Sequence, residues 1–513
     1  MLVIKNLSLY MIKDLRVLLK DFSFSLSPGQ KVALIGEEGN GKSTLLKAIY
    51  NEDLIFEYVE ISGQISKTGE IIGYLPQQIN AEDSHFSTRD FLNKQVSLED
   101  FDYTLFYSLL DEIEFNEDRI SEDIYLYNLS GGEKIKFQLI CLLMKNPTLL
   151  LLDEPTNDLD LASIKWLEKF ILSQSIPIMF VSHDETLLNK CANTIIHIEQ
   201  IIRKTEPKYT IAGVGYSEYI ENRNNLINRQ EQLAKKEKDQ YDKKMDRYRQ
   251  IYQKVEHEQN SISRKDPQGG RLLKKKMHSI MSMGHRYERE KENMAKKPDY
   301  EDSILVRFGD EISIPNSKKI IELKLDKLIA GDKILSKGIE LDVYGATKMC
   351  IVGANGSGKT TLIRYILRYL MDSNIKYGYM PQDYFEMMDP KKNPVEFLSK
   401  IGSKSELTTI RTYLGSMNFT QEEMFHPVED LSGGQRAKLY FSKMILDESE
   451  VLILDEPTRN MSPLSGPEIR QALKSFKGCI ISVSHDRKYI EEVCDEIYRL
   501  DKTGLRRILN LVD

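Results

Sequence analysis

The chain has 513 residues, of which 41% are apolar and 29% are charged, and its formal net charge at neutral pH is −7. This length corresponds to about three domains of ordinary size, and a net negative charge argues against an indiscriminate nucleic-acid binder. No run of about 18 apolar residues occurs, so no membrane span is expected, and the start MLVIKNLSLY lacks the pattern of a signal peptide. The five cysteines include no CxxC pair and are expected to be reduced thiols of a cytosolic protein.

The first motif follows a short apolar stretch, VALIG at 32–36, which predicts a buried strand. GEEGNGKST then runs from Gly36 to Thr44 and matches the G-x-x-x-x-G-K-[ST] pattern, in which backbone N–H groups wrap phosphates. Lys42 is predicted to reach the β- and γ-phosphates of ATP, and Ser43 to offer its hydroxyl to Mg²⁺. The helix expected after this loop points its positive end at the anion.

Four further motifs follow in the first half of the chain. YLPQ ends at Gln77, LSGGE contains Ser130 and Gly132, LLLLDEPT contains Asp153 and Glu154, and VSHD contains His183. Asp153 ends an apolar strand, where a carboxylate can hold Mg²⁺. Glu154 is the candidate for polarising the attacking water, and the His183 imidazole is expected to touch the γ-phosphate.

The middle of the chain is basic and helical. From Glu221 to Lys297 there are 21 Lys and Arg residues against 12 Asp and Glu, so this segment carries +9 and the remainder carries −16. More than forty residues without Gly or Pro predict a long helix. The break at DPQGG predicts a turn near 266–270, and the second run of helix formers predicts a return helix of roughly 40 Å.

The second half repeats the first. Ser130 precedes Asp153 by 23 residues, as Ser432 precedes Asp455, and each aspartate precedes the histidine of its VSHD motif by 30. We therefore expect two copies of one α/β P-loop fold in residues 1–212 and 299–513, joined by a helical hairpin at 213–298 with its tip near 263–277. In the second copy, Glu456 and His485 take the catalytic roles. The candidate Mg²⁺ ligands are Ser43, Gln77 and Asp153 in the first copy and Thr360, Gln382 and Asp455 in the second. The candidate ATP-binding residues of both copies are Gly36, Gly39, Gly41, Lys42, Ser43, Thr44, Gln77, Ser130, Gly132, Gly353, Gly356, Gly358, Lys359, Thr360, Thr361, Gln382, Ser432 and Gly434.

Taken together, these motifs resemble those of the ATP-binding-cassette family, in which LSGGE and LSGGQ are the signature. The resemblance implies two cassettes that pair head to tail within a monomer, each ATP lying between the glycine loop of one and the signature of the other. Site one would join the first loop, with Lys42, to Ser432 and Gly434. Site two would join the second loop, with Lys359, to Ser130 and Gly132.

Two departures from the family pattern stand out. Asp160 lies where the family has its D-loop carboxylate, but the second copy has Ser462 there, so communication between the sites is expected to be asymmetric. The family also stacks adenine on an aromatic residue before the loop. Tyr10 has this role or a core role in the first copy, and LDKLIAGDKIL offers no aromatic residue in the second.

Two fused cassettes with a charged helical linker resemble the ABC-F subfamily, especially the antibiotic-resistance members of the Vga, Lsa and VmlR type. This implies a cytoplasmic ATPase that binds the 70S ribosome at the E site and extends its linker towards the 23S rRNA and the P-site tRNA. Drugs such as lincosamides, streptogramin A and pleuromutilins would be displaced from the peptidyl-transferase centre, and ATP hydrolysis would release the protein. The residues expected at the RNA-contacting tip are Arg264, Lys265, Arg271, Leu272, Lys274, Lys275, Lys276 and Met277.

Other interpretations remain open. The linker tip also fits a solvated turn on an exposed helix pair. A housekeeping translation factor would use the same ATPase on P-site tRNA. An exporter ATPase would recruit a separate membrane protein, and a DNA-repair ATPase would also join cassette halves by a coiled coil.

Overall fold

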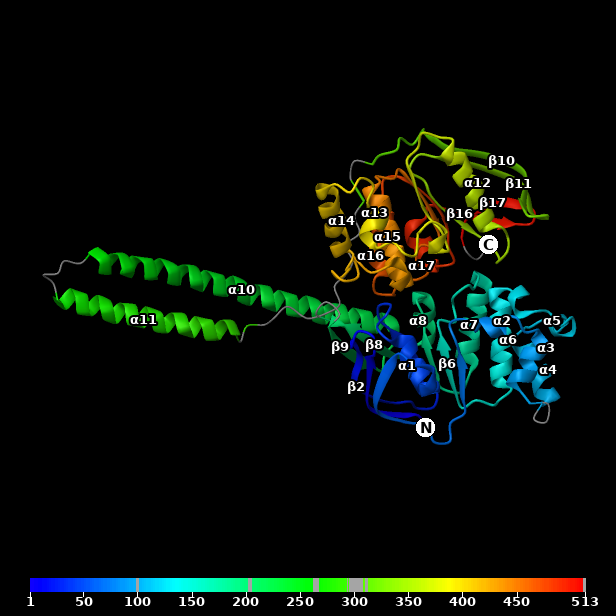
Figure 1. Cartoon of the computed structure of the whole chain (residues 1–513), viewed down its shortest axis with the longest axis horizontal. Helices are drawn as coiled ribbons and strands as arrows, with labels where there is room; N and C mark the ends of the chain where they lie inside the picture. The colour runs from blue at the N-terminus through cyan, green and yellow to red at the C-terminus, as the bar shows by residue number, and fades with distance from the viewer. Residues whose placement is uncertain are drawn as a thin grey trace. The chain divides into compact units, whose positions relative to one another are not determined.

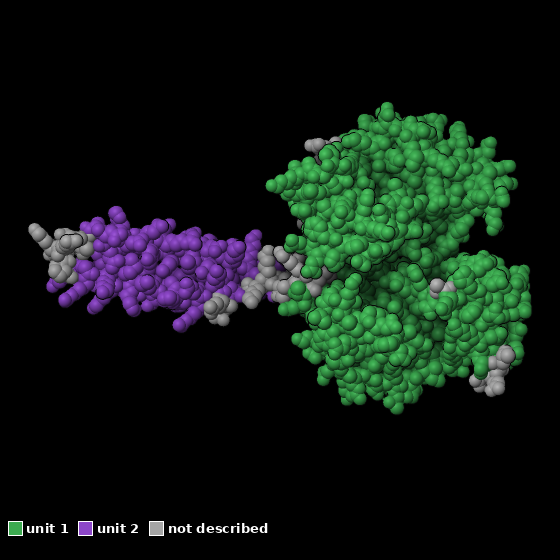
Figure 2. Space-filling view, viewed as in Figure 1, with its two compact units in different colours: residues 1–216, 301–513 green, residues 217–300 purple. Residues whose placement is uncertain are grey.

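The computed structural model describes residues 1–97, 101–201, 205–261, 267–292, 294, 308–309 and 312–510. Two compact units divide the chain (Figure 2): residues 1–216 together with 301–513, and residues 217–300. Both copies of the repeated motifs therefore lie in one unit, and the basic segment forms the other.

The first cassette is built on a six-stranded sheet of order β5-β6-β7-β3-β8-β9, in which only the β8–β9 pair is antiparallel. Every residue of β3, β6 and β7 is buried, which explains their continuous apolar sequences. The strands are β3 (Lys31–Ile35), β5 (Ile72–Leu75), β6 (Leu149–Asp153), β7 (Ile178–Val181), β8 (Thr194–Gln200) and β9 (Glu206–Ala212).

A separate antiparallel sheet of order β2-β1-β4 packs over helix α1 (Lys42–Tyr50) in the same cassette. Its strands are β1 (Val3–Met11), β2 (Val17–Ser25) and β4 (Val59–Ser66), and Leu7, Leu9 and Phe22 lie fully buried in the shared core. The other helices are η1 (Glu52–Leu54), α2 (Ala81–Ser84), α3 (Thr88–Gln95), α4 (Tyr103–Glu112), α5 (Asp118–Ser121), η3 (Leu126–Asn128), α6 (Gly131–Leu143), α7 (Leu161–Ser173) and α8 (Glu185–Cys191).

The second cassette repeats this design with the sheet order β13-β14-β15-β12-β16-β17. Its antiparallel sheet pairs β10 (Lys319–Ala330) with β11 (Lys333–Tyr344). The remaining strands are β12 (Lys348–Val352), β13 (Tyr377–Met380), β14 (Val451–Asp455), β15 (Cys479–Val483), β16 (Glu496–Asp501) and β17 (Gly504–Ile508). The helices are α12 (Lys359–Met371), η4 (Tyr384–Glu386), α13 (Pro394–Leu398), α14 (Lys404–Ser416), η5 (Val428–Asp430), α15 (Gly433–Leu446), α16 (Gly466–Ser475) and α17 (Arg487–Val493). The predicted fold of two tandem α/β cassettes is confirmed.

The basic segment is a pair of helices, α10 (Tyr216–Ser261) and α11 (Pro267–Glu292), drawn in green in Figure 1. They lie side by side, because Lys244 of α10 forms an ion pair with Glu290 of α11 at 2.7 Å and the rings of Tyr248 and Tyr287 meet edge to face. The 26 residues of α11 extend about 40 Å at 1.5 Å per residue.

The position of the turn corrects one prediction. Gly269 and Gly270 were expected in the turn, but both lie in the first turn of α11. Pro267 begins this helix, as proline does readily because its missing N–H has no helical partner there. Asp266, also predicted in the turn, lies outside the described residues.

Among the described residues, no helix has both the length and the hydropathy needed to cross a bilayer. All five cysteines are free: Cys141, Cys191, Cys350, Cys479 and Cys494.

Candidate functional site

Each glycine loop lies between a buried strand and the helix that follows it. Gly41 and Gly358 cap helices α1 and α12 in the left-handed conformation, with φ of 90° and 101°. The Lys42 ammonium donates to the carbonyls of Gly36 and Glu37 at 2.8 and 2.9 Å. The Lys359 ammonium makes the equivalent bonds to Gly353 and Ala354 at 2.8 and 3.1 Å. Both loops therefore have a buried cation beside a helix N-terminus, an arrangement suited to a polyphosphate.

A hydroxyl and a buried carboxylate meet beside each loop. Ser43 donates to Asp153 at 2.8 Å, and Thr360 donates to Asp455 at 2.9 Å. Burial raises the pKa of both aspartates above their ordinary value. Hydroxyl and carboxylate oxygens at the phosphate end of a loop are ligands that fit Mg²⁺, which also takes oxygens from the phosphates. Two of the three candidate Mg²⁺ ligands of each copy are thus brought together.

The predicted glutamine ligands are placed differently. The Gln77 amide donates from Nε2 to Glu154 at 2.8 Å, so this glutamine contacts the candidate base. Gln382 lines the cavity of the second site together with Thr360 and Asp455.

Glu154 and His183 form a close pair in the first cassette. Oε1 of Glu154 lies 3.2 Å from Nε2 of His183, and Asn157 donates to Oε2 of the same carboxylate at 2.6 Å. Burial alone would raise the pKa of Glu154, but the His183 charge and hydrogen bond, with Lys42, lower this pKa to about 2. Burial would lower the pKa of His183, but the Glu154 charge and hydrogen bond together raise it. The close contact therefore favours the ionised form of Glu154 and the protonated form of His183.

The second cassette has the opposite electrostatics. His485 donates its backbone N–H to Glu456 at 3.2 Å, while its ring Nε2 lies 3.7 Å from the carboxylate. Burial, with the neighbouring Asp455 charge, raises the pKa of Glu456 to about 8, and burial with the Lys359 charge lowers that of His485 to about 4. Glu154 and Glu456 both have φ near +50° (49° and 55°), a left-handed conformation that is strained for a side chain of this kind.

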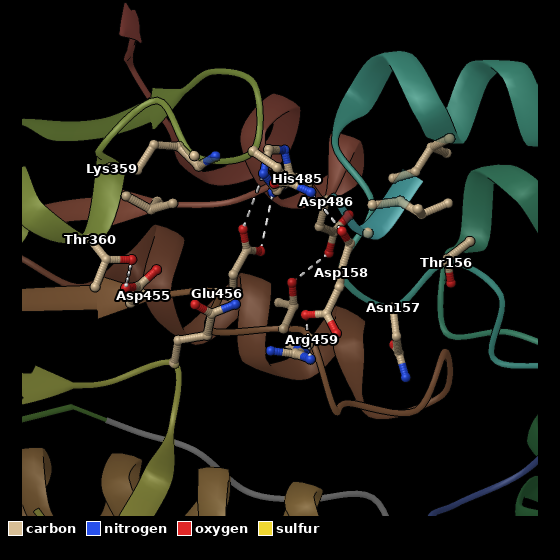
Figure 3. Close-up of a pocket in the computed structure, with 18 of the residues that line it drawn as sticks. Thr156, Asn157, Asp158, Lys359, Thr360, Asp455, Glu456, Arg459, His485 and Asp486 are labelled. Atoms are coloured by element: carbon tan, nitrogen blue, oxygen red, sulfur yellow. Dashed lines mark hydrogen bonds and ion pairs between the residues drawn. The ribbon is translucent and has the colours of Figure 1, made fainter. Parts of the chain in front are cut away.

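Each signature begins a helix and closes on the loop of the other cassette. Ser130 and Ser432 are the N-caps of α6 and α15, each in a capping box with the residue three positions later. Gly131 of the first signature helps line a cavity of about 480 Å³ with Gly356, Lys359 and Thr361 of the second loop. Figure 3 shows this second site, with Asp158 of the first cassette beside Arg459 of the second.

The D-loops hold the two cassettes together at both sites. Asn355 of the second loop donates to the Asp158 carbonyl at 2.6 Å, and Arg459 forms an ion pair with the Asp158 carboxylate at 2.7 Å. At site one, Ser462 donates to the carboxylate of Glu37 instead. The D-loops therefore contact the opposite cassette through Asp158 at site two and Ser462 at site one, whereas the Asp160 carboxylate caps α7 by accepting the Ser163 N–H at 2.9 Å.

Sequence reasoning missed two features of the loops. Leu18 and Leu335 overhang Gly41 and Gly358, such that a Cβ on either glycine would lie 3.1 or 2.9 Å from the leucine. Each leucine precedes its glycine by 23 residues, a repeat that would have revealed both. The second missed feature is the pair Glu37 and Glu38 within the first loop.

Tyr10, the candidate for stacking on adenine in the first copy, lies half-buried on β1 opposite Val17.

Comparison with known proteins now decides the family. The profile described as "ABC transporter" matches residues 19–157 and 336–459, which together make up just over half of the chain. The chain belongs to this ATP-binding-cassette family.

Relatives within the family extend along nearly the whole chain. "ABC transporter F family member 2" of Arabidopsis thaliana is 27% identical, covering 95% of this chain and 75% of the relative. "Ribosome protection protein VmlR" of Bacillus subtilis is also 27% identical, covering 98% and 87%. Among solved structures, the complex of archaeal ribosomal stalk protein aP1 and the archaeal ribosome recycling factor aABCE1 has a TM-score of 0.57 at 16% identity, covering 98% and 90%, a likeness of fold. Within the family, the chain is an ABC-F protein.

The linker tip of this ABC-F protein presents mostly exposed basic side chains. Arg271, Lys274, Lys275 and Lys276 are exposed on the first turns of α11, as is Leu272. Met277 is half-buried, one helical turn before the buried Ile280, so it is less available to RNA than the lysines. Arg264 and Lys265 lie outside the described residues.

Proposed function

We propose that this ABC-F protein hydrolyses ATP to ADP and phosphate at two composite sites in the cytoplasm, and that the closed pair of cassettes binds the ribosome. The observation that carries the proposal is the combination of two complete glycine-loop sites with a long, basic helical hairpin in one chain. The sites supply the energy and the hairpin supplies a surface for RNA.

In the proposed reaction, the glycine loops and their lysines bind the phosphates of ATP. Ser43 with Asp153, and Thr360 with Asp455, would hold Mg²⁺, which supplies charge for the phosphate oxygens. The Glu154 and Glu456 carboxylates each orient a water for attack on the γ-phosphorus and accept its proton. His183 and His485, beside these carboxylates, position them.

The ribosome is the proposed partner because the hairpin is basic and because similar proteins have names that refer to the ribosome. Four exposed basic residues within six positions of α11 can neutralise RNA phosphates. The relative VmlR is named as a ribosome protection protein, and the archaeal fold neighbour is named as a ribosome recycling factor. We place the hairpin in the E site, directed at the 23S rRNA and the P-site tRNA.

The finer proposal is drug protection. A hairpin helix of about 40 Å with basic residues at its tip is suited to reach the peptidyl-transferase centre and to displace lincosamides, streptogramin A or pleuromutilins. The second candidate is a translation factor that adjusts P-site tRNA without protecting against drugs. It is favoured by the equal 27% identity to the Arabidopsis F family member, whose name does not refer to resistance.

A growth assay separates these candidates. A drug-sensitive bacterium that expresses the wild-type chain should grow at higher concentrations of at least one of the three drug classes. Changing Lys274, Lys275 and Lys276 to Gln should remove this gain. The matched control changes the exposed Lys235, Lys236 and Lys238 of α10 to Gln and should keep it. Unchanged inhibitory concentrations for all three classes with the wild type would exclude drug protection.

A further inference from the structure

The two glycine loops differ at their second and third positions. The first reads GEEG, with Glu37 and Glu38, and the second reads GANG, with Ala354 and Asn355. Two carboxylates in a loop that binds a polyphosphate are electrostatically unfavourable, because like charges at close range repel. Their contacts explain what they do.

Glu38 occupies the position of Asn355 in the repeat but makes a different bond. Asn355 donates from its amide to the Asp158 carbonyl of the opposite D-loop at 2.6 Å. A carboxylate has no proton to donate, and Glu38 instead accepts the backbone N–H of Gly434 in the opposite signature. A Cβ on Gly434 would meet Oε2 of Glu38 at 3.0 Å, so the carboxylate lies directly against this glycine.

Gly434 is the second residue of α15, whose first N–H groups have no partner within the helix and carry partial positive charge. The family resemblance pairs Ser432 and Gly434 with the first glycine loop around the ATP of site one, so we expect these N–H groups to face its γ-phosphate. An anionic oxygen of the chain itself therefore lies on the donor that the nucleotide needs.

Glu37 strengthens this arrangement from the adjacent position. Its carboxylate accepts hydrogen bonds from Ser462 and Ser465 of the second cassette and lies 3.7 Å from the Lys438 ammonium. The side chains of Glu37 and Lys438 are only 18% and 12% exposed. The loop of site one is thus tied to the opposite cassette by both of its carboxylates, whereas Ala354 in the second loop has no side-chain group for such bonds.

We propose that Glu38 is a specificity-determining residue of site one, whose carboxylate competes with the γ-phosphate of ATP for the Gly434 N–H. Site one then takes ATP only in molecules in which Glu38 has left Gly434, and site two, with Asn355, fills first. This inference rests on the proposed ATP function. The apparent affinity of site one for ATP equals its intrinsic affinity multiplied by the fraction of molecules in which the Gly434 N–H is free. ADP lacks the competing phosphate, so its affinity is not reduced by Glu38.

The test measures nucleotide binding at one site at a time in the full chain. Glu154→Gln/Glu456→Gln prevents turnover, and Lys359→Ala then leaves site one as the binding site while Lys42→Ala leaves site two. Binding of Mg²⁺–ATP and of ADP is followed by titration calorimetry, with and without Glu38→Asn, which copies the second loop. Glu38→Gln, with the same shape and no charge, serves if the asparagine variant does not fold.

We expect Glu38→Asn to tighten ATP binding at site one about tenfold, the effect of freeing one charge-assisted donor, and to change ADP binding less than about twofold. In the Lys42→Ala chain, where only site two binds, Glu38→Asn should change neither ATP binding nor ADP binding. Unchanged or weaker ATP binding at site one would overturn the inference while leaving the proposed ATPase intact. If neither single-site chain binds ATP at all, the proposed function itself fails, and the inference fails with it.

Discussion

Nε2 of His183 lies 3.2 Å from Oε1 of Glu154, and both side chains are buried. The repeat places His485 and Glu456 in the same positions, but there the ring nitrogen is 3.7 Å from the carboxylate. One candidate base is held ionised by its histidine, with a pKa of about 2, and the other holds its proton up to a pKa of about 8. Two sites with the same motifs therefore have different chemistry at neutral pH.

The first prediction concerns the pH dependence of hydrolysis at each site. In Glu154→Gln, Glu456 is the remaining base and acts only when deprotonated, so activity should rise with pH and reach half its plateau near 8. In Glu456→Gln, the remaining Glu154 is already ionised far below neutral pH, so no rise from this carboxylate is expected between about pH 6 and 9. Phosphate release measured across this range checks both profiles, and identical profiles would contradict the assignment.

The second prediction concerns the ion pairs that join the cassettes. Arg470 of α16 is 5% exposed and lies 2.8 Å from Glu185 of the first cassette and 2.7 Å from Glu492. Arg470→Met leaves Glu185, which is only 13% exposed, without its cation, so the free energy of unfolding should fall by about 3 kcal/mol. The matched control is Arg364→Met, because Arg364 and its partner Glu386 are 59% and 37% exposed. The control should cost less than about 1 kcal/mol. Denaturant unfolding followed by circular dichroism measures the free energy of unfolding of both variants. Equal decreases would mean that the Arg470 ion pairs stabilise the cassette interface no more than an exposed ion pair does.

The third prediction concerns the close approach of the two linker helices. A Cβ on Gly284 of α11 would lie 2.7 Å from the Tyr248 hydroxyl and 3.0 Å from its ring, whereas a Cβ on Gly270 would meet nothing within 4 Å. Gly270→Ala should therefore stabilise α11 by up to about 1 kcal/mol through helix propensity. Gly284→Ala should lose that gain to overpacking, which typically costs about 1–3 kcal/mol.

Hydrogen–deuterium exchange of α10 and α11 in the full chain measures this difference. We expect slower exchange in Gly270→Ala and faster exchange in Gly284→Ala than in the wild type. Slower exchange in both variants would show that Tyr248 moves aside at little cost and that the helices do not depend on the small residue.

Much of the fold follows from local sequence patterns. Buried parallel strands have continuous apolar sequences, so LLLLD and VLILD predict β6 and β14, and the loop motifs fix where α1 and α12 begin. The pairs Ser43–Asp153 and Thr360–Asp455 also follow, because the carboxyl ends of parallel strands meet at one edge of a sheet.

The remainder depends on contacts between distant residues. The residue type of Glu38 is plain in the sequence, but its bond to Gly434 requires the cassettes to be placed against each other. The ionisation of Glu154 and Glu456 depends on burial and on sub-ångström differences at the neighbouring histidines, which identical motifs do not record. The turn of the hairpin was misplaced because glycines normally end helices, whereas Pro267 begins one here.

The measurement that tests the central claim most directly is co-sedimentation with 70S ribosomes in the presence of ATP, comparing the wild type with Glu154→Gln/Glu456→Gln. The double variant should bind ATP, keep the cassettes closed and fail to hydrolyse. We predict that it pellets with ribosomes, that the wild type mostly does not, and that replacing ATP with ADP releases the variant. Failure of both proteins to pellet with ribosomes in ATP would contradict the account, since the ribosome would then not be the target of the ATP-closed chain.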